Sequence, residues 1–269
     1  MKWICCIIIQ ILLSFLLLGC LEQEGDTSYF DQAEYYFSTG QFNQARTLYQ
    51  QYIDEKEHGS KRYQAWNRLL SIRVDIYGDV QGGLDILKAM QMEFDREKDK
   101  ILDINASMAV MYERLGQPRE SRRIWKKNKE LAVSMRDKKE AALFMSKKGM
   151  QLREFEKVRE DLKDFSECSG EIDADLCSRI QYTLGKSYYM QTDLTRAGEI
   201  LSRAYRLDAG KEYKSRAGLL MAEVLLDQEE IDEAKALLKE LLDIHPNPGA
   251  IEVRLKNLTS SQDQSDFSR

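Results

Sequence analysis

Small residues recur at a nearly constant interval through almost the whole chain after residue 25. Successive members lie 38, 38, 37, 39 and 37 residues apart, and each is followed twelve positions later by a second, mostly small residue. The two sets are Ala33, Ser71, Ala109, Ser146, Gly185 and Ala222, and Ala45, Gly83, Ser121, Val158, Ala197 and Ala234. A period of this length indicates one supersecondary unit that is repeated and stacked on its neighbours.

Each repeat has apolar side chains spaced three and four residues apart on both sides of a turn. In the first repeat Tyr36 and Tyr49 flank the small residues, and Gly40 lies at the turn. This spacing places apolar groups on one face of a helix, so each repeat is predicted to be a hairpin of two helices of about fourteen residues. The fourth repeat fits least well, because Gly149 and Arg153 stand where an aromatic residue and a turn glycine are expected. The sequence predicts an all-α fold, an α-solenoid of about six helix-turn-helix repeats.

The pattern resembles the tetratricopeptide repeat (TPR), which has a small residue at position eight, an aromatic at eleven, glycine near fifteen and alanine at twenty. The resemblance covers roughly residues 26–248, and all six repeats match at position eight. It implies a right-handed superhelix whose concave face binds proteins or peptides. The period of 37 to 39 residues exceeds the usual length of about 34, and only the last repeat ends in proline, Pro246. A related all-helical solenoid is the alternative.

The N-terminus has a different character. Met1 and Lys2 precede an apolar run from Trp3 to Leu18, which ends in Leu17-Leu18-Gly19-Cys20. This resembles a bacterial lipoprotein signal peptide, which implies removal of residues 1–19 and acylation of Cys20, as with palmitate. The resemblance places the chain in the bacterial cell envelope, and Leu21 in place of aspartate favours the outer membrane, facing the periplasm. An uncleaved membrane helix is disfavoured, because the apolar run spans about 24 Å and a hydrocarbon core about 30 Å.

Composition indicates the remaining boundaries. Residues 20–28 are expected to be the lipidated cysteine and a polar tether, and residues 29–248 the repeat domain. Residues 249–258 are predicted to form a short helix that caps the last repeat. The tail, residues 259–269, contains four serines and no aliphatic residue, so we expect it to be disordered.

Two cysteines remain for a disulfide once Cys5 and Cys6 leave with the signal segment and Cys20 is acylated. Cys168 and Cys177 form an even pair in a chain expected to reach an oxidising compartment. A bridge between them would close the polar connector SGEIDADL and contribute about 2 to 3 kcal/mol. Two unpaired thiols are the alternative.

No sequence pattern indicates catalysis, a metal or a cofactor. The spacings HExxH, GxxxxGK[ST] and GxSxG are absent from the sequence. His58 and His245 are the only histidines, and both lie far in sequence from the cysteines, which disfavours a metal site. The 40 basic and 45 acidic residues are interspersed and give a net charge of −5, so nucleic acid is not an expected partner.

Partner-binding residues are expected on the first helix of each repeat, because these helices line the concave surface in the TPR family. Cations flanked by aromatic and aliphatic groups suit an extended or helical peptide with acidic groups. The candidates are Arg68, Ile72, Val110, Arg114, Leu143, Lys147, Tyr182, Lys186, Tyr189, Leu219 and Glu223.

These observations favour a noncatalytic, lipid-anchored periplasmic scaffold that docks other envelope proteins in its groove and assists assembly of an envelope complex. One alternative is a surface-exposed lipoprotein that binds host or matrix molecules. The other is an envelope enzyme whose reactive groups come from scattered groove residues, or a noncatalytic subunit of such an enzyme.

Overall fold

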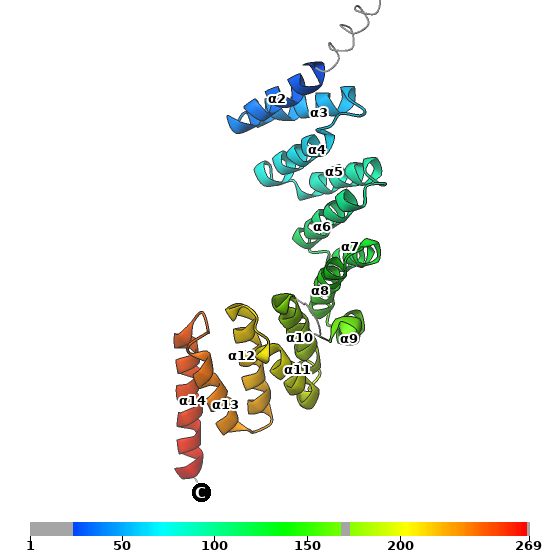
Figure 1. Cartoon of the computed structure of the whole chain (residues 1–269). Coiled ribbons are helices and arrows are strands. Elements are labelled where there is room, and N and C mark those ends of the chain that lie inside the picture. Colours follow the sequence, from blue (N-terminus) through cyan, green and yellow to red (C-terminus); the bar gives the residue numbers. More distant parts are fainter. Residues whose placement is uncertain (1–23, 168–172, 268–269) are drawn as a thin grey trace, which may run out of the picture. The chain divides into compact units, whose positions relative to one another are not determined.

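Regular structure is helical throughout the residues that the computed structural model describes, 24–167 and 173–267 (Figure 1). Thirteen α-helices, α2 to α14, follow one another, and no strand occurs in these ranges. The predicted all-α class is therefore confirmed. The helices divide into two compact units, one ending at Leu115 and the other beginning at Gly116. The predicted signal peptide, Cys20 and Cys168 lie outside the described residues.

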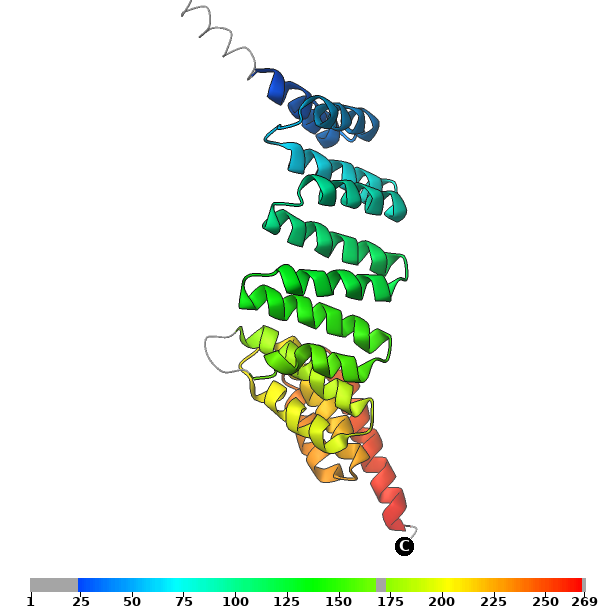
Figure 2. The same ribbon diagram turned by 90° about the vertical axis from the view of Figure 1, so that its right-hand side faces the viewer.

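Consecutive helices of the N-terminal unit pack against one another as hairpins (Figure 2). The elements are α2 (Glu24–Ser38), α3 (Phe42–Glu55), α4 (Arg62–Ser71), a π-helical segment (Ile72–Ile76), α5 (Val80–Glu93) and α6 (Lys98–Arg114). Because α2 begins at Glu24, the first repeat starts inside the stretch 20–28 that was predicted to be a tether.

The C-terminal unit continues the same pattern. Its elements are α7 (Pro118–Leu131), α8 (Met135–Gln151), α9 (Phe155–Leu162) with a 3₁₀ turn (Lys163–Phe165), α10 (Ala174–Tyr189), α11 (Leu194–Arg206), α12 (Lys211–Asp227), α13 (Ile231–Leu241) and α14 (Pro248–Phe267). In addition to the hairpin contacts, α10 touches both α8 and α12. The first helices of repeats four, five and six therefore lie side by side.

The ladder of small residues lies where helices cross, with one exception. Ala33 and Ala45 are fully buried, and a Cβ placed on Gly185 would lie 2.7 Å from Cγ of Leu201 in the next helix. Ser71 is only half-buried, and its Oγ donates to Oδ2 of Asp75 at 3.0 Å. The next residue, Ile72, is fully buried instead, and it begins the π-helical segment.

The turn within each repeat contains a residue with positive φ, seven positions after the first small residue. Glycine takes this position in the first three repeats, and a residue with a side chain takes it in the last three. The φ values are 76°, 71° and 69° for Gly40, Gly78 and Gly116, and 59°, 59° and 64° for Arg153, Thr192 and Glu229.

Helix α14 packs against the helices of the last repeat. Ile251 is buried, and Leu255 and Leu258 pack against the same cluster on α12 and α13. The helix continues to Phe267, beyond residue 258 where it was expected to end and into the tail that was expected to be disordered. The sequence has no proline or glycine after Gly249 to terminate the helix. None of the described helices has the length and apolar content needed to cross a bilayer.

Candidate functional site

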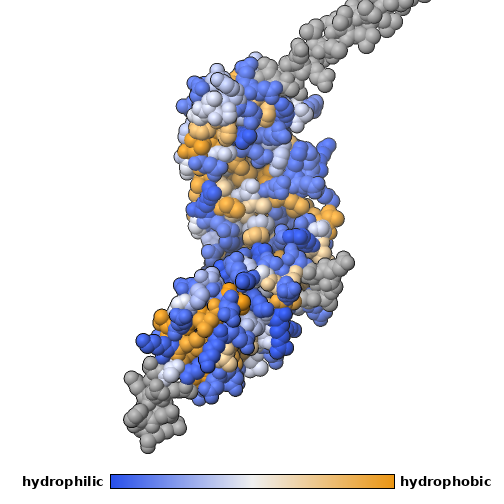
Figure 3. All heavy atoms as spheres, turned by 60° about the vertical axis from the view of Figure 1, so that its left-hand side comes forward, coloured by the Kyte–Doolittle hydropathy of each residue, from blue (hydrophilic) through white to orange (hydrophobic). Residues whose placement is uncertain are grey.

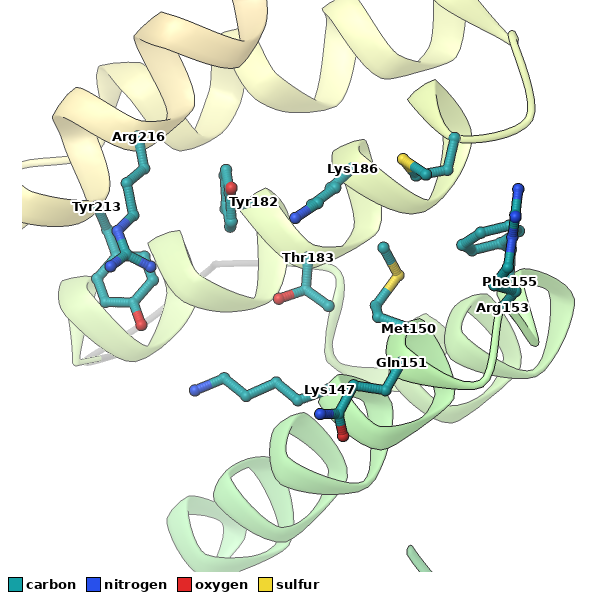
Figure 4. Close-up of a pocket in the computed structure, with 11 residues that line it drawn as sticks. Lys147, Met150, Gln151, Arg153, Phe155, Tyr182, Thr183, Lys186, Tyr213 and Arg216 are labelled. Atoms are coloured by element: carbon teal, nitrogen blue, oxygen red, sulfur yellow. The ribbon is translucent and has the colours of Figure 1, made fainter. Parts of the chain in front are cut away.

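A pocket of about 740 Å³ lies on the row formed by α8, α10 and α12 in the C-terminal unit (Figure 4). The turn after α8, the first residue of α9 and the residue after α10 complete it. The residues that line it are Lys147, Met150, Gln151, Arg153, Phe155, Tyr182, Thr183, Lys186, Met190, Tyr213 and Arg216.

Side-chain caps determine where two of these helices begin. Oγ of Ser134 accepts a hydrogen bond of 3.0 Å from the Asp137 N–H at the start of α8. One carboxylate oxygen of Asp173 accepts from the N–H groups of Asp175 and Leu176, at 3.1 and 3.2 Å, at the start of α10. Because the first N–H groups of a helix have no partner within it, such caps stabilise the starting position.

The pocket concentrates positive charge in a chain whose net charge is −5. Lys147, Arg153, Lys186 and Arg216 line it, and no aspartate or glutamate is among its lining residues. Within the described residues, the side chains of Arg153 and Lys186 have neither an ion pair nor a hydrogen bond. An anionic ligand would therefore meet two cations that no carboxylate of the described chain already occupies.

The other two cations already have partners within the chain. Arg216 lies 3.0 Å from Glu212 in an exposed ion pair one turn away on α12, and such pairs contribute less than about 1 kcal/mol. Nζ of Lys147 lies 5.1 Å from the centroid of the Phe144 ring, which stacks on Trp125 with centroids 4.5 Å apart. A ligand carboxylate can replace Glu212 at small cost.

Aromatic and apolar groups supply the rest of the pocket. Tyr182 and Tyr213 meet edge to face with centroids 6.3 Å apart. Burial raises the pKa of Tyr182, although the nearby Arg216 opposes this, so the phenol is neutral at physiological pH and able to donate a hydrogen bond. Phe155 is buried, whereas Met190 is 41% exposed at the pocket. These groups suit an elongated ligand with both anionic and apolar parts.

Three of the predicted groove residues, Lys147, Tyr182 and Lys186, are brought together in this pocket. Ile72 and Leu143, by contrast, are fully buried in the core, so their assignment to the groove is wrong. The first helix of an internal repeat is covered by its own second helix and by the next repeat. Only a narrow stripe of each first helix is accessible, and these two side chains lie outside it.

The remaining candidates of the C-terminal unit make contacts within the chain. Glu223 forms an ion pair with Arg254 of α14. Burial, together with the neighbouring Asp227, raises the pKa of Tyr189. Leu219 packs partly buried against the core of the last repeat. None of these predicted residues lines the pocket.

The other predicted residues belong to the N-terminal unit. Val110 is 40% exposed and Arg114 is exposed on α6, while Arg68 is held by Glu34. A hollow of about 520 Å³ in this unit is lined by uncharged residues of α2 and α3, including Gln32, and it contains none of the candidates.

Sequence reasoning missed most of the pocket. Tyr213 and Arg216 lie on the first turns of α12, whereas the prediction considered only positions near the small residue of each repeat. Met190 follows the end of α10, a position that was not considered. Arg153 did carry a signal, since it stands where a turn glycine is expected, but a residue type in a turn does not reveal which cavity its side chain reaches.

Among the described residues, Cys177 is the one cysteine. Cys177 is buried in α10 and is disulfide-bonded, but its predicted partner Cys168 lies outside the described residues, so that pairing stays a prediction. No group of three or more histidine, cysteine, aspartate or glutamate residues placed to hold a metal ion occurs in the described part of the chain.

Solved structures with similar folds share little sequence with this chain. The N-terminal domain of the EccA1 ATPase from the ESX-1 secretion system of Mycobacterium tuberculosis has a TM-score of 0.54 at 14% identity, covering 87% of this chain and 90% of that one. MamA (residues 41 to the end) from Desulfovibrio magneticus RS-1 has a TM-score of 0.53 at 14% identity, with coverages of 68% and 94%. BtubC from P. vanneervenii has a TM-score of 0.51 at 15% identity, with coverages of 89% and 90%. No curated protein sequence matches significantly.

The helical hairpins and these similarities define an α-solenoid protein. Two family models described as tetratricopeptide repeat match residues 27–55 and 188–254. The chain therefore contains tetratricopeptide repeats, and the predicted resemblance is confirmed for these repeats.

Proposed function

We propose that this chain is a noncatalytic scaffold whose C-terminal unit binds an acidic segment of a partner protein in the pocket on α8, α10 and α12. The supporting observation is a cavity with four cations and no carboxylate on its lining, in a chain of net negative charge. Tetratricopeptide repeats, which the chain contains, form surfaces that bind proteins and peptides.

The kind of ligand follows from how the pocket is built. Its groups come from three consecutive first helices and an intervening turn, so an elongated ligand can contact all of them at once. Guanidinium groups bind carboxylates through two parallel hydrogen bonds, and the two tyrosines add rigid aromatic surface. A peptide segment presents acidic and apolar side chains along one line, as this arrangement requires.

Crosslinking in living cells tests this function. A photoreactive amino acid at Tyr182 is expected to capture a partner, whereas the same group at Tyr35, exposed on α2, is expected not to capture that partner. Lys186→Glu should strongly reduce capture from position 182, and the matched change Lys239→Glu on α13 should not. Equal capture in both charge variants would contradict the proposed site.

We further propose that the chain is anchored by lipid at Cys20 in the bacterial envelope, with the folded part in the periplasm, where it assists assembly of an envelope complex. The apolar run before Leu17-Leu18-Gly19-Cys20 supports this. Cys20→Ser should abolish incorporation of labelled fatty acid and release the protein from membranes, while Cys177→Ser should not. Digestion of the folded part by protease added to intact cells would exclude the periplasmic location.

A further inference from the structure

Arg153 takes a backbone conformation that favours glycine. Its φ of 59° lies in the left-handed region, and the equivalent turn positions of the first three repeats, such as Gly40 and Gly78, are glycines. A residue with a Cβ is less stable than glycine in this conformation by about 1 kcal/mol of conformational free energy. The backbone of this turn would therefore be more stable with glycine than with arginine.

Glycine at position 153 would remove a cationic side chain from the pocket. It lines the pocket, and within the described residues it has no ion pair, hydrogen bond or ring contact. Thr192 and Glu229 share the same backbone conformation in the next two repeats, but neither lines the pocket. Among these three residues, only Arg153 places a charge where a ligand could bind.

Two arginines lie at opposite ends of the pocket (Figure 4). Arg216 is at the end formed by α12, where its guanidinium lies 5.3 Å from the centroid of the Tyr213 ring, while Arg153 is at the other end, where Phe155 also lines the pocket. Lys186 lies between them. The pocket therefore has a guanidinium group at each of two separated ends.

We propose that Arg153 and Arg216 bind two separate acidic side chains of one extended peptide segment, and that an apolar side chain of the same segment packs near Phe155. This inference rests on the proposed function and specifies its ligand. A single carboxylate would engage only one guanidinium, whereas acidic groups at two separated positions would engage both. Arg153 is then a specificity-determining residue, although glycine would stabilise the backbone of this turn more than arginine does.

Opposite effects on stability and affinity provide the test. The probe is a short dye-labelled peptide in which glutamate alternates with leucine, and fluorescence anisotropy reports its binding. Arg153→Gly should raise the melting temperature and weaken binding about tenfold, since it removes one charge-assisted contact. Glu229→Gly, the matched change at the same turn position two repeats after Arg153, should raise the melting temperature and leave affinity unchanged. Arg153→Asn, which also tolerates this backbone, should weaken binding as Arg153→Gly does.

Peptide variants separate this inference from the function on which it rests. In wild type, replacing the glutamate at either end by glutamine should weaken binding, and in Arg153→Gly one of these replacements should lose its effect. If Arg153→Gly binds as tightly as wild type while Lys186→Glu does not, the two-ended inference is overturned and the acidic-segment function stands. If wild type does not distinguish the glutamate peptide from its all-glutamine counterpart, both are overturned.

Discussion

Arg68 of α4 and Glu34 of α2 form a two-pronged ion pair, with 2.8 Å between Nε and Oε1 and 2.9 Å between Nη2 and Oε2. The Tyr49 hydroxyl also donates to Oε1 of Glu34, at 2.6 Å. The guanidinium lies 4.5 Å from the centroid of the Phe37 ring. The pair joins the first helices of two repeats, so a residue predicted to face a ligand instead holds the N-terminal unit together.

This pair should make stability depend on pH. Burial raises the pKa of Glu34, but hydrogen bonds from Arg68 and Tyr49 outweigh burial, and the pKa lies below its usual value. The stabilisation is present above the unfolded-state pKa of about 4.3 and is lost as pH falls through the lower folded-state pKa. Glu34→Gln should lower the free energy of unfolding by about 1 kcal/mol at neutral pH. The variant should lose less stability than wild type when the pH is lowered. Urea titrations at several pH values measure this, and identical pH profiles would contradict it.

Two helical glycines should respond oppositely to alanine. A Cβ on Gly185 would lie 2.7 Å from Cγ of Leu201 and 3.4 Å from its backbone nitrogen, so Gly185→Ala should destabilise the chain by about 2 kcal/mol. A Cβ on Gly198 meets only Val224, at 3.6 Å, so Gly198→Ala should gain up to about 1 kcal/mol of helix propensity. Thermal unfolding distinguishes the two, and stabilisation by Gly185→Ala would show that the helices are not closely packed there.

The turn position should also show opposite effects in different repeats. Gly40 has a φ of 76° and open space where a Cβ would lie, so Gly40→Ala should cost about 1 kcal/mol from backbone conformation alone. Thr192→Gly should stabilise by about 0.5 to 1 kcal/mol, because a β-branched residue is poorly suited to positive φ. Melting temperatures measure both effects, and equal signs would contradict the shared conformation.

The predicted disulfide has a direct test. Without reductant, the mass of the chain purified from its native compartment should be lower by two hydrogen atoms than after reduction, if Cys168 and Cys177 are bridged. Cys177→Ser should abolish this difference and lower stability by about 2 to 3 kcal/mol. An unchanged mass on reduction would contradict a bridge between Cys168 and Cys177.

Much of the fold could be predicted from the sequence, because a helical hairpin is formed by residues that are close together along the chain. Spacing of apolar residues identified the helices, and turn glycines such as Gly78 marked where each hairpin reverses. The assignment to the groove failed at Ile72, which is fully buried at the start of a π-helical segment. It also ended the last helix too early, because the polar composition after residue 258 does not itself stop a helix.

The site depended on contacts between repeats. The sequence alone determined the all-α class, the repeat period and the cations on first helices, since these follow from periodicity along a single segment. Only the tertiary structure decided that Lys147 and Lys186 share a pocket with Arg153 and Arg216, and that Arg68 does not bind there. The physical reason is that side-chain pairing and burial depend on how neighbouring helices pack, which brings together residues that are far apart along the chain.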